Sequence, residues 1–209
     1  MRKKAALAGV LVAALLLFGC EDAGAGGGFQ ARLLAAAAPL AEEAGSPRAL
    51  TLDSVRYGSF SSPDAAELCA LFKYDAPAHA EGLDRTLAVV CAADDLEVVA
   101  SIDLMADSVQ LAFLPAGDGT QRVLYLGAST YQGITSRTQG LYRVSVGAWE
   151  PLESGLPALD GFREVYLAED TVLCVGQDGA SAAYNWNAAA ECFLPAPAGD
   201  APTRAAAPA

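Results

Sequence analysis

Apolar and polar residues alternate along short segments in the central and C-terminal parts of the chain. Residues 97–104 show the pattern best, because apolar side chains occupy every second position from Val98 to Leu104. A period of two places apolar side chains on one face of a β-strand. Comparable runs occupy residues 49–52, 87–90, 109–114, 121–126, 141–146, 163–167, 171–175 and 180–186. The pattern therefore predicts a series of short strands.

Turn residues separate these runs. Asp118-Gly119 lies between the runs at 109–114 and 121–126, and Gln177-Asp178-Gly179 lies between two later ones. Asp-Gly between alternating segments is a strong hairpin signal. Closely spaced strands without intervening helices are typical of an antiparallel all-β domain, which we place at residues 46–195.

One helix is predicted before the strands, over residues 29–45. Leu33, Leu34 and Leu40 stand among alanines there, and Gly45-Ser46-Pro47 ends the segment. Glycine-rich residues 20–28 have the composition of a flexible tether. Residues 196–209 are rich in proline and alanine, and their composition predicts a disordered tail.

A weak internal period suggests how the strands are grouped. Strand-like runs start at Leu87, Val123 and Glu164, and an earlier run starts at Ala49. Successive starts are separated by roughly 40 residues, which is close to the repeat length of four-stranded propeller blades. The spacing therefore predicts up to four propeller-like blade units. A β-sandwich is the alternative topology.

The segment from Tyr57 to Leu68 adds a resemblance to this picture. It reads Tyr-Gly-Ser-Phe-Ser-Ser-Pro-Asp-Ala-Ala-Glu-Leu. It resembles an FG-GAP repeat, the blade unit of integrin-type propellers, in which a Gly-x-Phe turn precedes a strand. The family's Asp-rich calcium loop is not present, because Asp64 is the only acidic residue between Phe60 and Glu67. The resemblance therefore implies a blade without a calcium site.

The N-terminal segment of the chain has the features of an export signal. Arg2, Lys3 and Lys4 precede an uncharged apolar run, Ala5–Phe18. This run has the length of a secretory signal, and it is shorter than the roughly 20 residues that span a membrane. Residues 1–19 are therefore predicted to be a signal peptide.

The signal ends in Leu17-Phe18-Gly19-Cys20, which resembles the lipobox of bacterial lipoproteins. The resemblance implies cleavage before Cys20 and attachment of a diacylglycerol to its thiol. Phe18 is bulkier than the family's usual residue at that position. An ordinary secretory signal followed by a chance cysteine is the alternative. The lipobox implies a protein anchored to the cell membrane on its extracytoplasmic face.

Charge limits the partners that this chain can bind. The 209 residues carry a net charge of −12, and loss of residues 1–19 leaves 10 basic and 25 acidic residues, a net charge of −15. An acidic surface cannot neutralise phosphates, so we expect no nucleic-acid partner. It is also repelled by anionic membranes, so membrane attachment must come from the lipid.

Four cysteines remain after Cys20: Cys69, Cys91, Cys174 and Cys192. An even number in an exported domain allows disulfides, and the simplest local pairs are Cys69 with Cys91 and Cys174 with Cys192. Buried free thiols are the alternative, because cysteine is among the most buried residue types. We expect no metal site, since the chain has no Cys-x-x-Cys motif and one histidine.

The sequence contains few candidates for catalysis. It has no Gly-x-Ser-x-Gly elbow, no His-Glu-x-x-His pair and no phosphate-binding loop, and its one histidine, His79, lies in a predicted loop. The neighbouring acids Asp94-Asp95 and Glu169-Asp170 have the character of turn residues. We expect no catalytic residues and no cofactor. A hydrolase using these dispersed acids is the alternative function.

Aromatic residues are the remaining candidates for a binding site. Tyr131 and Trp149 lie in the Gly-flanked stretches 127–133 and 147–151 and are predicted to be exposed. Amphipathic rings of this kind can stack on peptides or sugars. The sequence thus predicts a non-catalytic binding, sensing or accessory module with a protein, peptide or glycan ligand.

Overall fold

The computed structural model describes residues 25–43, 49–74 and 85–197. Its elements are α1 (Ala25–Glu43), β1 (Leu50–Gly58), β2 (Glu67–Tyr74), β3 (Arg85–Ala92), β4 (Val98–Met105), β5 (Ser108–Pro115), β6 (Gln121–Tyr131), β7 (Ile134–Ser145), β8 (Ala148–Leu152), the 3-10 helix η2 (Leu159–Gly161), β9 (Phe162–Ala168), β10 (Thr171–Gly176), β11 (Ser181–Asn187) and β12 (Cys192–Pro195). The strands form three four-stranded antiparallel sheets. The predicted all-β class, with one preceding helix, is confirmed.

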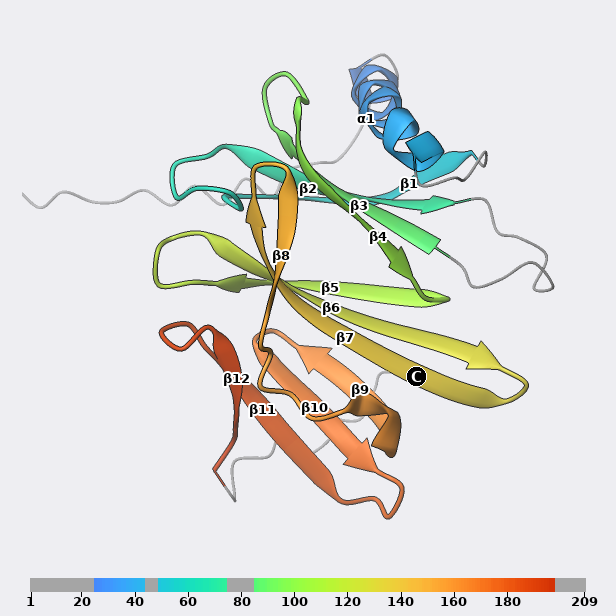
Figure 1. The fold of residues 1–209 in the computed structure, drawn as a ribbon, viewed down its shortest axis with the longest axis vertical. Helices are drawn as coiled ribbons and strands as arrows, with labels where there is room; N and C mark the ends of the chain where they lie inside the picture. The colour runs from blue at the N-terminus through green and yellow to red at the C-terminus, as the bar shows by residue number, and fades with distance from the viewer. Residues whose placement is uncertain (1–24, 44–48, 75–84, 198–209) are drawn as a thin grey trace, which may run out of the picture.

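Each sheet is built from consecutive strands in sequence order. Sheet 1 contains β1 to β4, sheet 2 contains β5 to β8, and sheet 3 contains β9 to β12. Figure 1 shows the layers stacked in the order α1, sheet 1, sheet 2 and sheet 3. Sheets 1 and 2 are therefore covered on both faces.

The faces of sheet 1 follow the two-residue period of its strands. Leu68 and Phe72 of β2 pack with Leu33 of α1 on one face. Cys69 of β2 and Val90 of β3 pack with Val123 of sheet 2 on the other. Both faces of the central strands are apolar because each one contacts another layer.

A second core joins sheets 2 and 3. Leu124 of β6 packs there with Val172 and Cys174 of β10 and with Trp186 of β11. The indole Nε1 of Trp186 also donates a hydrogen bond of 2.7 Å to the carbonyl oxygen of Pro115, at the end of β5. This contact satisfies the one polar atom of a largely buried ring.

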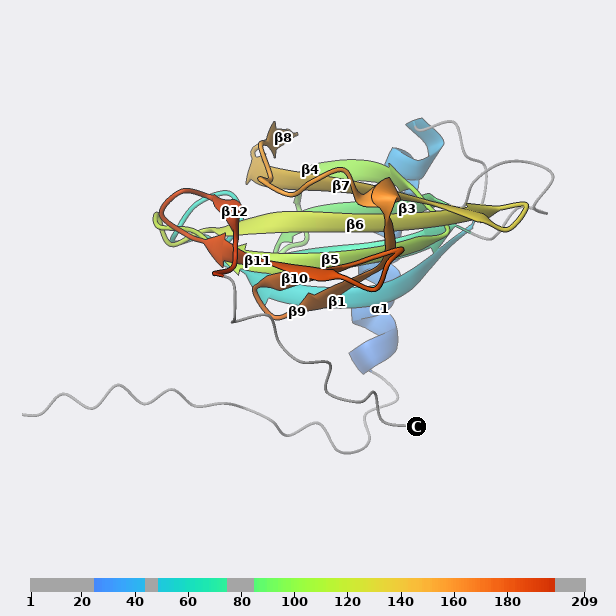
Figure 2. The ribbon, with the colours of Figure 1, turned by 90° about the horizontal axis from the view of Figure 1, so that it is seen from below.

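The outer face of sheet 3 is not covered by any described element. Figure 2 looks onto this face. It presents Tyr166, which is 43% exposed, and Leu194, which is 44% exposed. The stack therefore ends here in a sheet with one solvent-facing side, as is common for antiparallel sheets.

The predicted repeat differs from the observed grouping. The sheets begin at Leu50, Ser108 and Phe162, so the observed units are longer than the predicted ones. The runs at 87–90 and 123–126 are the third strand of sheet 1 and the second strand of sheet 2. The predicted starts at Leu87 and Val123 therefore lie inside sheets and do not mark where a sheet begins. The strand before Leu87, β2, is buried on both faces and lacks the alternation on which the predicted period relied.

The helix also differs from its predicted bounds. It begins at Ala25, so residues 25–28 of the predicted tether form its first turn, and it ends at Glu43. Residues at the end of a packed helix extend it at little cost once the helix has nucleated. No helix among the described residues has the length and apolar character required to cross a membrane. Cys20, the predicted signal peptide and residues 198–209 lie outside the described residues.

Candidate functional site

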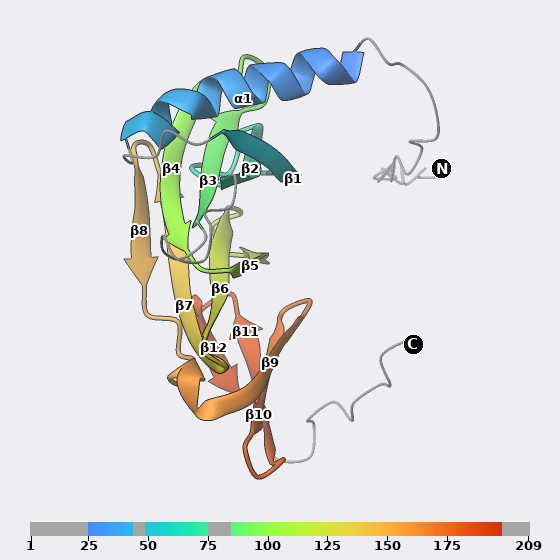
Figure 3. The ribbon, with the colours of Figure 1, turned by 90° about the vertical axis from the view of Figure 1, so that its right-hand side faces the viewer.

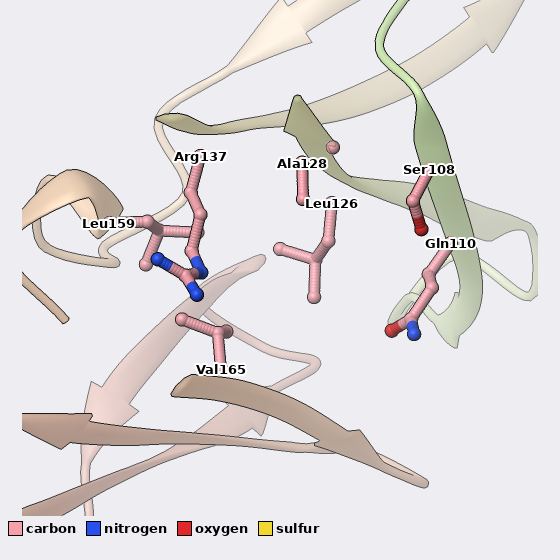
Figure 4. Close-up of a pocket in the computed structure, with 8 residues that line it drawn as sticks. Ser108, Gln110, Leu126, Ala128, Arg137, Leu159 and Val165 are labelled. Carbon is pink, nitrogen blue, oxygen red and sulfur yellow. The ribbon is translucent and has the colours of Figure 1, made fainter. Parts of the chain in front are cut away.

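A small pocket opens between sheets 2 and 3, beside the 3-10 helix η2. It encloses about 70 Å³. Figure 4 shows most of its lining side chains. The lining consists of Ser108, Gln110, Leu126, Gly127, Ala128, Arg137, Leu159 and Val165.

Sheet register builds the floor of this pocket. Ala128 of β6 pairs with Ser108 of β5 on one side and with Arg137 of β7 on the other. Directly opposite residues in antiparallel strands share a face, so these three side chains form one row across the sheet. Leu126, two residues earlier, lies in the next row beside Gln110.

The far side of the pocket comes from sheet 3 and its leading turn. Leu159 of η2 is buried, and Val165 of β9 packs against the same core. Figure 4 places Arg137 and Leu159 on one side, Ser108 and Gln110 on the other, and Leu126 and Ala128 between them. The pocket thus has an apolar middle with polar groups at both ends.

Hydrogen bonds to backbone carbonyls orient the guanidinium of Arg137. Its Nη1 donates to the carbonyl oxygen of Phe162 at 2.8 Å, and its Nη2 donates to that of Arg163 at 2.5 Å. The carboxylate of Asp160 accepts hydrogen bonds from the backbone N–H of Arg137 at 2.5 Å and from the Ser136 hydroxyl at 3.2 Å. These bonds hold η2 and the start of β9 against β7.

A buried ionic cluster joins the same two sheets at their opposite end. Arg122 of β6 is fully buried. Its Nε and Nη2 donate to the carboxylate of Glu191 at 2.9 and 2.6 Å, and Nη2 also reaches Asp118 at 2.9 Å. Arg143 of β7 adds a contact of 3.0 Å to the carboxylate of Glu191. Two positive and two negative charges therefore balance in one cluster.

The electrostatics of this cluster favour its charged forms. Hydrogen bonds from Thr120 and Arg122 hold the pKa of Asp118 far below its usual range. The hydrogen bond from Arg122 is the main cause of the lowered pKa of Glu191, with Arg143 contributing, and Glu191 in turn raises the pKa of Arg122. Because each group pairs within the protein, the cluster connects the sheets and is not arranged for an external ligand.

The FG-GAP-like segment holds its loop with a carboxylate. Glu67 is buried, and its Oε2 accepts hydrogen bonds from the backbone N–H groups of Phe60 at 2.7 Å and Ser61 at 2.9 Å. The Ser61 hydroxyl donates to Oε1 of the same carboxylate. Phe60 packs edge-on against Phe113 of sheet 2 with ring centroids 5.5 Å apart. Backbone donors thus satisfy the acidic side chain of this loop.

The candidate acids of the hydrolase alternative lie in two separate turns. Asp94 and Asp95 accept backbone hydrogen bonds in the turn between β3 and β4. Glu169 and Asp170 form the turn between β9 and β10, on a different sheet. Among the described residues, no group of three or more His, Cys, Asp or Glu side chains could hold a metal ion. His79 lies outside the described residues.

The structure has the alternative of free thiols at Cys69, Cys91, Cys174 and Cys192, and neither of the two possible disulfides is formed. Cys69 belongs to the core that faces sheet 2, whereas Cys91 belongs to the core that faces α1. Their side chains point to opposite faces of sheet 1. Cys174 and Cys192 are separated by β11, which lies between their strands. Strand order and side-chain alternation thus keep both pairs apart.

Of the two aromatic candidates, the structure describes the side chain of Trp149 only. Trp149 lies in β8 and not in a loop, it is half-buried, and its ring packs edge-on against Tyr142 at 5.8 Å between centroids. It joins the cores between sheets 1 and 2. Tyr131 is the last residue of β6, and its side chain lies outside the described part.

Sequence reasoning missed the residues that the structure brings together. The burial of Arg122 could have been predicted, because Arg122 lies on the same face of the strand at 121–126 as the apolar residues Leu124 and Leu126. Its partner Glu191 lies 69 residues away, in a turn that no periodicity marks. Arg137 and Gln110 carried no local signal.

Comparison of this chain with protein-family models, curated proteins and solved structures gives no match.

Proposed function

We propose that this protein is a lipid-anchored extracytoplasmic lipoprotein that acts as a non-catalytic binding or sensing module. Cys20 is its lipid attachment site, and the pocket between sheets 2 and 3 is its ligand site. The anchor is supported by the lipobox-like Leu17-Phe18-Gly19-Cys20. The binding role is supported by the pocket, because polar side chains from β5 and β7 flank an apolar floor between two sheets. An apolar concavity with a few convergent polar groups is the usual form of a small-molecule site.

The proposal extends to the arrangement of the sheets. We propose that the three sheets are consecutive blade units of a propeller-like array, because each is a four-stranded meander. Their first strands, β1, β5 and β9, lie toward the same side of the stack (Figure 3). Sites between neighbouring sheets then recur along such an array. A sandwich, in contrast, consists of two packed sheets.

The hydrolase alternative receives less support. General acid–base chemistry on a glycosidic bond requires two carboxyl groups within about 5 to 10 Å across a cleft. Asp94 and Glu169, one from each candidate pair, occupy turns of sheets 1 and 3, with sheet 2 stacked between these sheets. We therefore favour binding over hydrolysis.

The anchor is tested with the Cys20→Ser variant in the native host. We expect the unaltered chain to incorporate labelled palmitate and to sediment with membranes, and the variant to lose both properties. The matched control is Cys192→Ser, which leaves the lipobox intact. Labelling of the Cys20→Ser variant at the level of the unaltered chain would contradict the proposed anchor.

The ligand site is tested by screening small neutral, anionic and cationic compounds that fit a pocket of this size. Binding is followed through the backbone amide signals of Gly127 and Ala128 in nuclear magnetic resonance spectra. We expect at least one compound to shift both signals saturably. Ala128→Leu, which fills the floor between Ser108 and Arg137, should abolish the shift. A complete screen without a perturbation at these amides would contradict a binding role for the pocket.

A further inference from the structure

We infer that the pocket between sheets 2 and 3 binds a short aliphatic monocarboxylate, with the carboxylate on the guanidinium of Arg137. This inference rests on the proposed function and specifies its ligand class. It is carried by the donors of Arg137, by the size of the pocket and by the distribution of polar and apolar groups around it.

Arg137 is a cation with more donors than its contacts in the described structure use. A guanidinium has five N–H groups, and the structure gives two hydrogen bonds from this one, to the carbonyl oxygens of Phe162 and Arg163. These acceptors are neutral, and no ion pair of Arg137 is found within the described residues. The carbonyls fix the plane of the guanidinium, which leaves the remaining donors in a rigid arrangement suited to a carboxylate.

Arg137 differs in this respect from other partly or fully buried arginines of the fold. Arg122 is held by the carboxylates of Glu191 and Asp118, and Arg85 contacts the carboxylate of Asp103. The half-buried guanidinium of Arg137 stays accessible, so a ligand carboxylate can reach it and pair with its charge. A ligand carboxylate would supply the counter-charge that Arg137 does not receive from the described residues.

The nearby acid does not occupy this role. Asp160 uses its carboxylate to accept the backbone N–H of Arg137 and the hydroxyl of Ser136. Its hydrogen bonds therefore fix the position of η2 and leave the guanidinium donors to the pocket. Arg163, whose carbonyl oxygen accepts a hydrogen bond from Arg137, pairs through its own side chain with Glu164 at 3.3 Å.

The volume limits the ligand to a few atoms. A pocket of about 70 Å³ is small beside the roughly 300–1,000 Å³ of ordinary ligand sites. Propionate has the right size, whereas a sugar ring with its hydroxyl groups is too large for the pocket.

The apolar middle selects the rest of the molecule. Leu126, Leu159 and Val165 would contact the hydrocarbon chain of the ligand, while Ser108 and Gln110 lie at the end away from Arg137. No acidic side chain is among the described residues that line the pocket, so an amino acid would bury its ammonium group without a counter-charge. The arrangement thus favours a monocarboxylate over a zwitterion.

The test titrates the full chain with sodium propionate and, separately, with propionamide, its neutral analogue of the same size. Backbone amide shifts of Gly127 and Ala128 report occupancy. We expect propionate to bind with a dissociation constant on the order of 1 mM, as suits so small a ligand. Propionamide should bind at least about tenfold more weakly, because it lacks the charge that pairs with a guanidinium.

Variants of Arg137 test whether propionate binding depends on its guanidinium. Arg137→Met should abolish propionate binding, while Arg137→Lys should retain part of it through the remaining charge. Arg56→Met removes an exposed arginine of β1, remote from the pocket, and should leave binding unchanged. If Arg137→Met does not fold, as judged by circular dichroism, Arg137→Lys and the comparison of propionate with propionamide still decide the question.

The outcomes separate this inference from the proposed function. Equal binding of propionate and propionamide at the pocket would overturn the carboxylate class and leave the binding site standing. The carboxylate class would also be overturned if propionate shifted only amide signals outside the pocket. The same holds if propionate caused no shift while another compound of the screen bound in the pocket. Failure of every compound in the screen would overturn both.

Discussion

At the scale of single residues, the buried Arg122 shows how a charge is accommodated between two sheets. Its guanidinium is fully buried, yet it pairs with Glu191, Asp118 and Thr120. Burying an ion costs several kcal/mol unless its partners replace water. Because Glu191 comes from sheet 3 and Arg122 from sheet 2, this pairing also selects the alignment of the two sheets.

Removal of the charge on Glu191 should destabilise the fold. Glu191→Gln leaves Arg122 with a weaker partner while Asp118 and Thr120 remain. We expect a loss of about 2 kcal/mol in the free energy of unfolding, less than for a fully buried pair because Glu191 is partly exposed. Urea denaturation measures this loss. The matched control Glu153→Gln changes an exposed glutamate and should stay within about 0.5 kcal/mol; equal losses in both variants would contradict a role for the cluster.

The same cluster predicts a dependence of stability on pH. Folding lowers the pKa values of Glu191 and Asp118 below their ordinary values of 4.5 and 3.8. The folded state therefore binds fewer protons than the unfolded state, and its stability decreases as the pH falls below about 4.5. Urea midpoints at pH 7 and pH 3.5 should differ more for the unaltered chain than for Glu191→Gln. Identical differences would show that Glu191 does not contribute.

The thiols should be present but unreactive in the folded protein. Burial raises the pKa of Cys69 to about 12 and the pKa values of Cys91 and Cys174 to about 11, so little thiolate exists at pH 8. When the Cys20→Ser chain is unfolded without reductant, four thiols should react with a disulfide reagent. The half-buried Cys192 should react first under native conditions. A count of two or none in the unfolded chain would support disulfides instead.

At the scale of elements, α1 covers sheet 1 through one apolar stripe. Leu33, Ala37 and Ala41 are buried at intervals of four residues, which places them on one side of a helix. The hydrophobic pattern at 29–45 predicted the helix. It did not show whether the helix packs on the domain or stands apart, because the alanines supply little contrast between its faces.

A matched pair of substitutions tests this packing. Ala37→Glu places a charge where the structure leaves no exposed surface, whereas Ala38→Glu changes an exposed neighbour. We expect the first to reduce the free energy of unfolding by more than about 2 kcal/mol and the second by less than about 0.5 kcal/mol. Chemical denaturation compares them. Similar small effects would indicate a helix that does not pack on sheet 1.

The strands show why sequence reasoning found some elements and missed others. The hairpin of β5 and β6 was predicted because Asp118-Gly119 marks its turn, and Gly119 has the positive φ of 87° that such a turn requires. In contrast, β2 is buried on both faces and has no alternation, while β8 and β12 have only five and four residues. A pattern of period two cannot identify such strands.

At the scale of the whole molecule, sheet 2 takes part in both interfaces. Val123 of β6 faces sheet 1, while Leu124, the next residue, faces sheet 3. One strand therefore contributes alternate side chains to two cores. This sharing should couple the unfolding of all three sheets.

The two tryptophans allow that coupling to be measured. Trp149 lies between sheets 1 and 2, and Trp186 lies between sheets 2 and 3. In Trp186→Phe and Trp149→Phe, the remaining tryptophan reports one interface. We expect its fluorescence transition in urea to coincide with the circular dichroism transition of the same variant. Earlier loss of the Trp186 signal would mean that sheet 3 unfolds independently.

The sequence by itself determined the strand-rich class and the main hairpin, and it alone predicts the export signal, because these depend on neighbouring residues and short periods. Only the tertiary structure decided the layer order, the pairing of Arg122 with Glu191 across 69 residues and the pocket around Arg137. It also separated Cys69 from Cys91 on opposite faces of one sheet. The physical reason is that these features arise from contacts between distant segments, which strand register and sheet stacking bring together and local patterns do not encode.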